Sequence, residues 1–561
     1  MLFRSFSFSA EAQTTVPPEM NSGMIEKSLR QSRPVYKPPP EQEPPKITIK
    51  DSRKLKDPGA GPSFFVKRIE IEGNTLIDDE ILLPIVDIGE GMEATLGVLS
   101  LMANEITALY ASKGYFLTKV YIPQQEVQDD VVKLQVSEGR IGKVEVTGTK
   151  KLDKEDFLER MVEVKEEPVL REQTLERALL ELNDLLGVQV RSTLKPGELP
   201  GTSDLVLEIT ETRPYTFSFD GDNFGSRFTG PIRLGMSGTF GNLLTLGDQF
   251  YIKWTRSDFG QDSYSPFYTF PLNSKGTRLK LAYTFSEQEL GEGLTLLNTG
   301  GTTRIASLEV SHPLHRTRSS QLSVSGGLDI KSFANKQQSE STTKDNPIDI
   351  SLGFGGNFSD PYLGRNFYDL KFQLGLKEVD YGYEKISRTQ GRADVFTTTF
   401  SLNRFQSTKV LNSYFILKAS GQFNSARALS PGQTSAGGTG TVRGYPLSEI
   451  SGDLGFILSV EYVIPVPWKI SLIDSMPTLD KILSFNGFID HGSVFIRDSL
   501  VGENDQGITG VGGGFKINIP KKEGVHPALS FALTYGIPAL GGPVPSDQSF
   551  GIVYISGLMS Y

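Results

Sequence analysis

Apolar and polar residues alternate along the chain from residue 212 to residue 561. In the stretch 278–285 every odd position is apolar and most even positions are polar, and 249–254, 369–377 and 529–536 follow the same period. Successive side chains of a β-strand point to opposite faces, so this period predicts strands with one apolar and one polar face. Lys and Asp recur on the polar face, which suits a hydrated interior, and an apolar aromatic face suits lipid.

The alternating region divides into about sixteen segments, which are typical of an antiparallel transmembrane β-barrel. The long connections run from an odd-numbered to an even-numbered segment, whereas those from even to odd are mostly short. Outer-membrane barrels have long external loops and short periplasmic turns, so we expect the first strand to start in the periplasm. The exception is 464–481, a longer predicted periplasmic turn. The predicted strands are 215–222, 232–241, 247–257, 264–270, 277–286, 303–311, 320–333, 348–358, 367–377, 394–404, 412–423, 454–463, 482–491, 508–518, 527–536 and 549–560.

The region before residue 212 has helical periods and an internal repeat of roughly 75 residues, which suggests two copies of one structural unit. Residues 66–73 align with residues 141–148, and each copy alternates β-branched with charged residues before a glycine. Apolar residues at intervals of three and four then predict a helix, and a strand pair closes each copy. The order β-α-α-β-β predicts two small α+β domains in tandem. The predicted helical faces are Leu99, Met102, Ile106 and Leu109, and Leu175, Leu179, Leu182 and Leu186.

The first 62 residues divide into three parts. Residues 1–19 contain Ala10-Glu11-Ala12, a small-residue pattern that fits a signal-peptide cleavage site, but they lack the apolar core of a signal peptide. We interpret them as a tail or as the remnant of a truncated signal peptide. Residues 20–33 predict one short helix, and the alternative is a disordered tail. Closely spaced prolines in residues 34–62 favour a stiff, extended polyproline II linker.

Composition narrows the functions open to this chain. The formal net charge of −9 provides no basic footprint for nucleic acid. The chain has no cysteine and four histidines, so thiolate chemistry is excluded and metal ligands are scarce. The sequence contains neither a Gly-x-Ser-x-Gly nucleophile elbow nor a phosphate-binding loop with its lysine. We therefore expect no cofactor, no metal and no enzymatic activity.

Two short motifs lie in the predicted barrel. One is in 424–453, the longest predicted connection, between the eleventh and twelfth strands, and the other is on the thirteenth strand. An arginine can hold a carboxylate through two parallel hydrogen bonds, and a glycine permits a tight turn at a loop tip. Each residue also has a simpler interpretation by itself: Arg443 could be an ordinary surface-loop arginine, and Asp490 an ordinary lumen-facing carboxylate. The candidate residues are Val442, Arg443, Gly444 and Tyr445 in the loop and Phe488, Asp490 and Gly492 on the strand.

These motifs, behind two α+β domains and a barrel of this size, resemble those of the outer-membrane transporters of two-partner secretion, V-R-G-[FY] and F-x-D-x-G. The resemblance implies that Arg443 pairs with Asp490 on the inner wall of the barrel. It further implies a helix in 20–33 that can plug the pore. The domains it implies are polypeptide-transport (POTRA) domains at 63–139 and 140–211 and an outer-membrane β-barrel at 212–561.

The resemblance implies a pore in the bacterial outer membrane whose periplasmic POTRA domains receive an unfolded secreted partner and export it to the cell surface. We expect the partner, an adhesin, a haemolysin or a haem-binding protein, to add a strand to an open sheet edge. The other expected partners are outer-membrane lipid and the barrel-assembly machinery that inserts this chain, for which Tyr561 offers an aromatic end. The alternatives are an insertion or assembly factor for other barrels, an outer-membrane enzyme and a passive porin, although a porin leaves the soluble front third unexplained.

Overall fold

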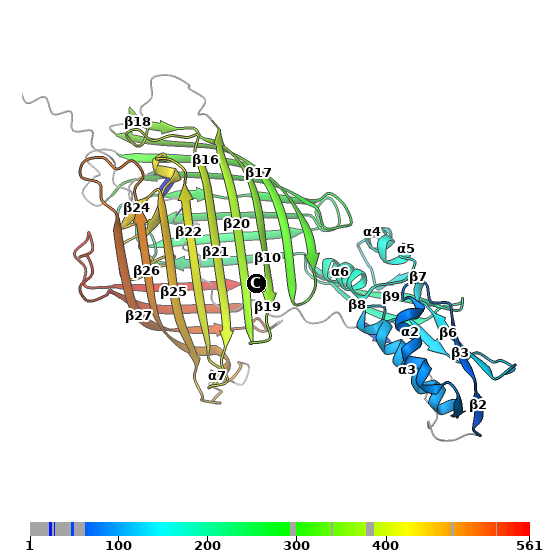
Figure 1. The fold of residues 1–561 in the computed structure, drawn as a ribbon. Coiled ribbons are helices and arrows are strands. Elements are labelled where there is room, and N and C mark those ends of the chain that lie inside the picture. The colour runs from blue at the N-terminus through cyan, green and yellow to red at the C-terminus, as the bar shows by residue number, and fades with distance from the viewer. Residues whose placement is uncertain are drawn as a thin grey trace, which may run out of the picture.

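The alternating segments after residue 212 form a closed antiparallel barrel of sixteen strands, so the predicted fold class is confirmed (Figure 1). The computed structural model describes residues 22–24, 27, 47–49, 62–291, 299–337, 340–376, 386–471, 473, 476–522 and 524–561. The barrel segments are β10 (Tyr215–Asp222), β11 (Arg233–Gly241), β12 (Gln249–Ser257), β13 (Asp262–Tyr264), β14 (Phe267–Pro271), β15 (Arg278–Glu289), β16 (Gly300–Arg316), β17 (Ser320–Gln337), β18 (Glu340–Asp345), β19 (Ile348–Ser359), β20 (Gly364–Leu376), β21 (Phe396–Ser407), β22 (Tyr414–Asn424), β25 (Leu454–Pro465), β26 (Leu483–Phe495), β27 (Gln506–Ile519), β28 (Ala528–Pro538) and β29 (Ile552–Ser560).

Two positions in the barrel are each filled by two segments. Strands β13 and β14 both pair with β12 and with β15, so they form one interrupted strand. Strands β18 and β19 both pair with β17, because β18 extends the wall beyond the end of β19. The predicted strand from 264 to 270 therefore lacked its short first part, β13.

The two faces of each strand differ as the alternation predicts. On β15, Leu281 and Tyr283 are exposed on the outer surface. On the inner surface Lys253 forms an ion pair with Asp220 at 2.9 Å, and Lys280 lies over the ring of Phe267. An apolar outer band around a polar interior is the arrangement that a barrel in lipid requires.

The barrel closes between its first and last strands, β10 and β29. Their ladder has only five residue pairs, from Ser218 with Ser560 to Asp222 with Ser556. The neighbouring ladder between β28 and β29 has nine pairs. The closing seam is thus held by fewer backbone hydrogen bonds than the strand junction beside it.

The first repeat forms a three-stranded sheet covered by two helices. Leu99, Met102 and Ile106 of the predicted helical face are buried against the sheet. The sheet has the order β3-β6-β5, with β3 parallel to β6, and a separate strand pair, β2 and β4, packs beside it. The elements are β2 (Phe64–Val66), β3 (Arg68–Glu72), α2 (Asp79–Val86), β4 (Met92–Ala94), α3 (Leu96–Ser112), β5 (Lys119–Tyr121) and β6 (Val131–Ser137).

The second repeat forms a sheet of order β1-β8-β9-β7 with helices on one face. Leu175, Leu179 and Leu182 are buried in its core, but α6 ends at Asn183, so Leu186 of the predicted face lies beyond the helix. The Asn183 side chain accepts a hydrogen bond from the Val190 backbone N–H at the start of the next strand. The elements are β7 (Arg140–Thr147), α4 (Lys154–Arg160), α5 (Val162–Glu166), α6 (Glu172–Asn183), β8 (Val188–Pro196) and β9 (Thr202–Glu211).

The two repeats share a structural device at the end of the last strand. Glu138 accepts hydrogen bonds from the backbone N–H groups of Thr75 and Leu76, and Glu211 accepts them from residues 150–152. The recipient loop follows β3 in the first repeat and β7 in the second. Burial raises the pKa of both carboxyl groups, yet these hydrogen bonds leave each pKa below its ordinary value. The repeat seen in the sequence is therefore a repeat in three dimensions.

A strand occurs inside the segment predicted to be a linker. Residues Ile47–Ile49 form β1, which pairs in parallel with β8, with Ile47 opposite Ser192. The chain thus adds a strand of its own to the sheet of the second repeat. The predicted tail 1–19 and the proline run 34–45 lie outside the described residues.

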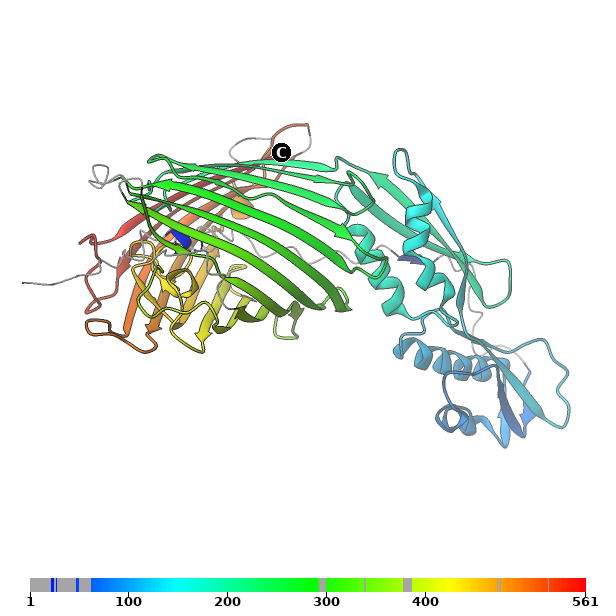
Figure 2. The same cartoon turned by 90° about the horizontal axis from the view of Figure 1, so that it is seen from above.

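The second repeat lies between the barrel and the first repeat (Figure 2). Two arginines hold it there: Arg316 at the end of β16 contacts Asp184, and Arg318 in the β16–β17 turn lies 2.8 Å from Glu176 of α6. Among the helices of the described residues, none combines the length and the apolar character needed to cross a membrane.

Candidate functional site

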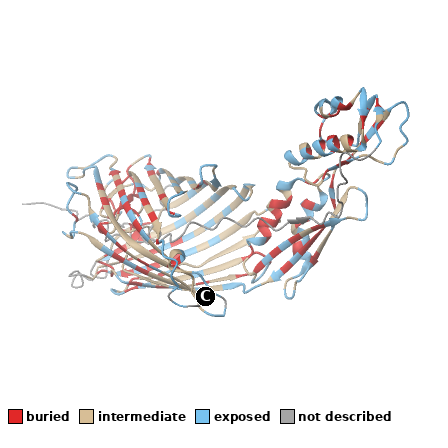
Figure 3. Ribbon diagram, turned by 90° about the horizontal axis from the view of Figure 1, so that it is seen from below, coloured by how far each residue is buried: buried red, intermediate tan, exposed pale blue. Residues whose placement is uncertain are grey.

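The connection between β22 and β25 folds back into the barrel. We call residues 425–453 loop 6. Its strands β23 (Thr434–Ala436) and β24 (Ile450–Gly452) pair with each other, and the loop tip packs against β26 and β27. Buried residues concentrate in the half of the barrel away from the two repeats (Figure 3). Val442 and Tyr445 have no exposed surface, so the tip of this loop is packed inside the barrel and does not lie on the molecular surface.

Arg443 at the loop tip binds Asp490 on β26. Its Nε donates to Asp490 Oδ2 at 2.7 Å and its Nη2 donates to Oδ1 at 2.9 Å. The Arg443 backbone N–H also donates to Oδ2 at 3.1 Å. Two parallel charge-assisted hydrogen bonds fix the orientation of the guanidinium as well as its distance. The structure therefore brings together the two residues that the family resemblance pairs.

A second carboxylate completes the contacts of Arg443. Its Nη1 donates to Glu461 Oε2 on β25 at 2.6 Å, and Lys516 of β27 contacts the other oxygen of Glu461. The ring of Phe488 lies beneath the guanidinium, 3.4 Å from its central carbon to the ring centroid. Arg443 thus binds residues of two adjacent strands and stacks on an aromatic face, which a lysine could not reproduce.

Glycines on both sides allow the loop tip to reach the wall. Gly444 has a φ of +98°, and a Cβ there would lie 2.6 Å from the backbone of Ile537. A Cβ on Gly492 would lie 2.9 Å from Val442 Cγ2. A Cβ on Gly510 of β27 would lie 1.8 Å from the carbonyl oxygen of Arg443. The wall is therefore shaped for this tip, and larger residues at these positions would push it away.

The base of loop 6 is held by two further arginines at the outer mouth. Arg388 binds Asp453 through Nη1 at 2.7 Å and Nη2 at 3.0 Å, and Asp453 has no exposed surface. Arg427 binds Glu503, in the connection between β26 and β27, at 2.7 Å through each Nη atom. Three external connections are thereby joined at the base of the loop.

The described part of the predicted N-terminal helix lies inside the barrel. Residues 22–24 and 27 are helical. The Ser22 backbone N–H donates to Asn335 Oδ1 of β17 at 3.2 Å, and Lys27 Nζ donates to Gln422 Oε1 of β22 at 2.7 Å. Lys27 Nζ also donates to the carbonyl oxygen of Gln433 in loop 6 at 2.5 Å. This segment therefore contacts both the wall and the loop.

All seven residues singled out in the two motifs lie in one cluster, but the sequence did not identify the residues around them. Glu461 and Lys516 at the tip, and the pair Arg388 and Asp453 at the base, stand outside both motifs. The alternation places Glu461 on the polar face of its strand, which was a usable signal. Its pairing with Arg443 depends on the register between β25 and β26, in which Glu461 lies opposite Phe488. That register is not visible in a single sequence.

A sixteen-stranded barrel with an inward-folded, arginine-bound loop and POTRA-like domains on one side defines a class of outer-membrane transporters. The chain belongs to the haemolysin secretion/activation protein family ShlB/FhaC/HecB, whose model matches residues 201–517. A ShlB-type POTRA domain matches residues 64–139. The protein is accordingly a two-partner secretion transporter of the outer membrane, with its POTRA domains in the periplasm, and the predicted family and location are confirmed.

Relatives from two genera cover most of the chain. The heme/hemopexin transporter protein HuxB of Haemophilus influenzae is 23% identical over 427 residues, covering 74% of this chain and 75% of HuxB. The outer membrane transporter CdiB of Escherichia coli strain 536 is 23% identical over 455 residues, covering 79% and 75%. The solved structure of CdiB from Escherichia coli has a TM-score of 0.72 at 20% identity and covers 96% of each chain, which shows a shared fold. The structure of BamA from Haemophilus ducreyi lacking POTRA domains 1–3 has a TM-score of 0.51 at 14% identity, covering 89% of this chain and 100% of that truncated chain.

Proposed function

We propose that this protein receives one unfolded secreted partner in the periplasm through its POTRA domains and passes it through the barrel to the cell surface. The observation that carries the proposal is loop 6, held inside a polar barrel by an arginine fork on the wall. A loop bound in this way closes the route through the barrel lumen without a covalent bond, and its release opens that route. The relatives described above are transporters rather than enzymes, which also supports the proposal.

Recognition in the periplasm follows from the sheet edges of the two repeats. In the described residues β1 covers the β8 edge of the second sheet, whereas β7 lies at its other edge and β3 and β5 are the edges of the first sheet. An extended partner segment pairs with such an edge through backbone hydrogen bonds. A partner that uses the β8 edge has to displace β1, which makes only a three-residue ladder.

The N-terminal helix acts as a plug in this proposal. It contacts β17, β22 and loop 6 through Ser22 and Lys27, so its departure removes contacts from the loop as well as from the pore. The segment that follows it, with β1, connects the plug to the POTRA sheet. Displacement of β1 by a partner and withdrawal of the plug would then be coupled through one chain segment.

The partner is an exported adhesin, a haemolysin or a haem-binding protein. The relatives are a heme/hemopexin transporter and outer membrane transporters, which favours a dedicated exporter. The second candidate is an insertion or assembly factor for other barrels, which the fold shared with BamA favours. We infer that outer-membrane lipid surrounds the barrel and that the barrel-assembly machinery inserts it.

A reversible crosslink tests whether loop 6 has to move. The chain has no cysteine, so Val442→Cys with Gly492→Cys creates the only possible disulfide, at a site where Val442 Cγ2 lies 2.9 Å from the Cβ built on Gly492. Under oxidising conditions we expect secretion of the partner to stop, and reduction should restore it. Val442→Cys alone is the matched control, because a Cβ on Gly492 would by itself crowd Val442 Cγ2. Full secretion with the crosslink formed contradicts the proposal.

Deletion of the gene separates the two candidate functions. A dedicated exporter should remove one large protein from the cell surface and medium and leave the other outer-membrane proteins at their normal levels. An assembly factor should reduce many outer-membrane barrels at once. Quantitative proteomics of the outer membrane and the culture supernatant measures both outcomes, and complementation with the wild-type chain is the control.

A further inference from the structure

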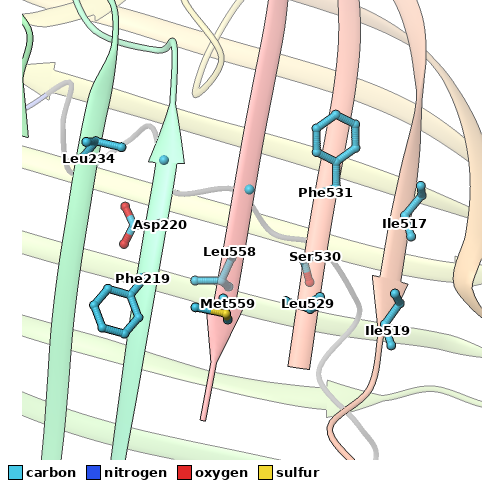
Figure 4. Close-up of a pocket in the computed structure, with 12 residues that line it drawn as sticks. Phe219, Asp220, Leu234, Ile517, Ile519, Leu529, Ser530, Phe531, Leu558 and Met559 are labelled. Carbon is cyan, nitrogen blue, oxygen red and sulfur yellow. The ribbon is translucent and has the colours of Figure 1, made fainter. Parts of the chain in front are cut away.

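The outer wall of the barrel is hollowed at its closing seam. The hollow spans β27, β28, β29, β10 and β11, so it lies on both sides of the junction between the first and last strands (Figure 4). Most of its lining is aliphatic or aromatic and points outward, to the side that faces lipid. The outward apolar lining residues are Phe219, Leu234, Ile517, Ile519, Leu529, Phe531 and Met559, whereas Leu558 lies opposite Asp220 on the lumenal face.

Two paired glycines create the hollow. Gly221 of β10 lies opposite Gly557 of β29 and both line the hollow, so the middle of this apolar surface lacks two side chains. A Cβ on Gly557 would meet no atom within 4 Å, which shows that the space there is open. The neighbouring outward residues Phe219 and Met559 carry bulky side chains. The gap therefore has the width of a side chain and apolar walls.

A basic turn lies at the periplasmic end of the hollow. Ile519 ends β27 and Leu529 stands near the start of β28, and both residues line the hollow. In the turn between them, Lys521 and Lys522 are exposed, two and three residues beyond Ile519. At about 3.3 Å per residue, Lys521 begins about 7 Å from the end of the hollow. By sequence the turn carries these two lysines and one glutamate.

The neighbouring turn marks the membrane surface at the same level. It connects β25 to β26 and includes α7 (Leu479–Ile482), and it exposes Trp468, Ile470 and Ile473. Leu483, the first residue of β26, pairs with Ile517, so this turn ends near the level of the last residues of β27. Exposed tryptophan and aliphatic residues beside lysines are typical of the water–lipid interface. Lys521 and Lys522, just beyond Ile519, therefore lie where lipid headgroups lie.

We propose that the seam holds one anionic phospholipid of the periplasmic leaflet, with an acyl chain in the hollow and its phosphate beside Lys521 and Lys522. The acyl chain replaces the side chains that Gly221 and Gly557 lack, and it covers the five-pair closing ladder of the barrel wall on its lipid side. The lysines select an anionic headgroup over a zwitterionic one by charge. The occupant is a lipid because the hollow opens on the lipid-facing surface.

Native mass spectrometry of the purified full-length chain tests the site. The chain is mixed with equal amounts of phosphatidylglycerol and phosphatidylcholine that carry the same acyl chains. We expect one retained phosphatidylglycerol per wild-type molecule. The variant Lys521→Gln with Lys522→Gln should lose the preference for phosphatidylglycerol, by about fivefold per lysine. Gly557→Leu, which fills the open space, should lower retention of both lipids.

Two controls make each outcome decisive. Lys275→Gln removes an exposed lysine from the β14–β15 turn, away from the hollow, and should keep the wild-type preference. The migration of unheated samples on a gel shows whether each variant still forms the barrel. A wild-type chain that retains no lipid, or a double lysine variant that keeps its preference, overturns the proposal. If Gly557→Leu fails to fold, the lysine variant still decides.

Discussion

The two ends of loop 6 are both held by arginine–carboxylate pairs, but against different parts of the molecule. At the tip, Arg443 binds Asp490 and Glu461, which belong to strands of the barrel wall. At the base, Arg388 binds Asp453 of the loop itself, and Arg427 reaches Glu503 of the next external connection. The tip is therefore anchored to a rigid surface, and the base is anchored to other loops.

This difference separates two kinds of movement. Breaking the tip contacts frees the motif residues from the lumen wall while the base stays in place. Breaking the base contacts loosens three external connections together and leaves the tip on the wall. The tip is thus suited to act as a switch in transport, and the base keeps the loop at the mouth of the barrel. Substitutions at each end should reveal the two behaviours separately.

We expect the largest effect from Asp490→Ala. The change removes three hydrogen bonds and leaves the buried guanidinium of Arg443 with Glu461 alone. Removal of one partner from a buried ion pair costs about 3–5 kcal/mol. Hydrogen exchange of the backbone amides in residues 441–445 should therefore accelerate by a factor of about a hundred or more. Partner secretion should fall with it.

Asp349→Ala is the matched control for this variant, because Asp349 is also a lumen-facing carboxylate, paired with Lys331. It should leave exchange in residues 441–445 unchanged. Equal exchange rates in Asp490→Ala and the wild type would show that the tip does not depend on this pair.

Arg388→Ala should accelerate hydrogen exchange less than Asp490→Ala does, and it should do so at the base of loop 6 rather than at its tip. Asp453 keeps hydrogen bonds from the backbone N–H groups of Ala428 and Arg497, so its charge stays partly satisfied. We expect a loss of about 2–3 kcal/mol at the base, because a buried carboxylate loses its only charged partner among the described contacts. Hydrogen exchange should increase in residues 426–430 and remain slow in 441–445. Acceleration at the tip would contradict the separation of the two ends.

Glu461→Gln should lie between the wild type and Asp490→Ala. Arg443 keeps its fork on Asp490, and the amide oxygen of glutamine still accepts a hydrogen bond. We expect a loss of about 1–2 kcal/mol at the tip, in line with one weakened hydrogen bond to a charged group. Exchange in residues 441–445 measures it, with Asp349→Ala again as control. An effect as large as that of Asp490→Ala would make Glu461 the primary anchor.

The sequence was sufficient for the barrel because one physical rule acts on every strand. Each strand has lipid on one side and water on the other. The polarity of a side chain such as that of Leu281 or Lys280 therefore indicates which face of the barrel it occupies. The motif positions around Arg443 were also readable, with help from the family resemblance. Strand β1 could not be predicted from the sequence, because three residues that pair with a distant sheet edge are too few to show a period.

The partners of the anchors were harder to predict for a similar reason. Asp453 lies one residue before β25 and Arg388 lies in the connection that precedes β21, so 65 residues separate the two. Neither residue belongs to an alternating segment that would fix its direction. Long-range pairs of this kind depend on how the external connections fold over one another. That information is distributed over several loops.

The smallest expected effect is a pH dependence at the base. The hydrogen bond from Arg427 lowers the pKa of Glu503 from its ordinary 4.5 to about 2. A lowered pKa stabilises the contact above pH 4.5, and this contribution is lost as the pH falls from 4.5 through about 2. A spin label on Val501→Cys, an exposed position in a chain without cysteine, should become more mobile over that interval and stay unchanged between pH 5 and 8. In the background of Glu503→Gln the label should be mobile at every pH, and a transition that persists there would assign the titration to another group.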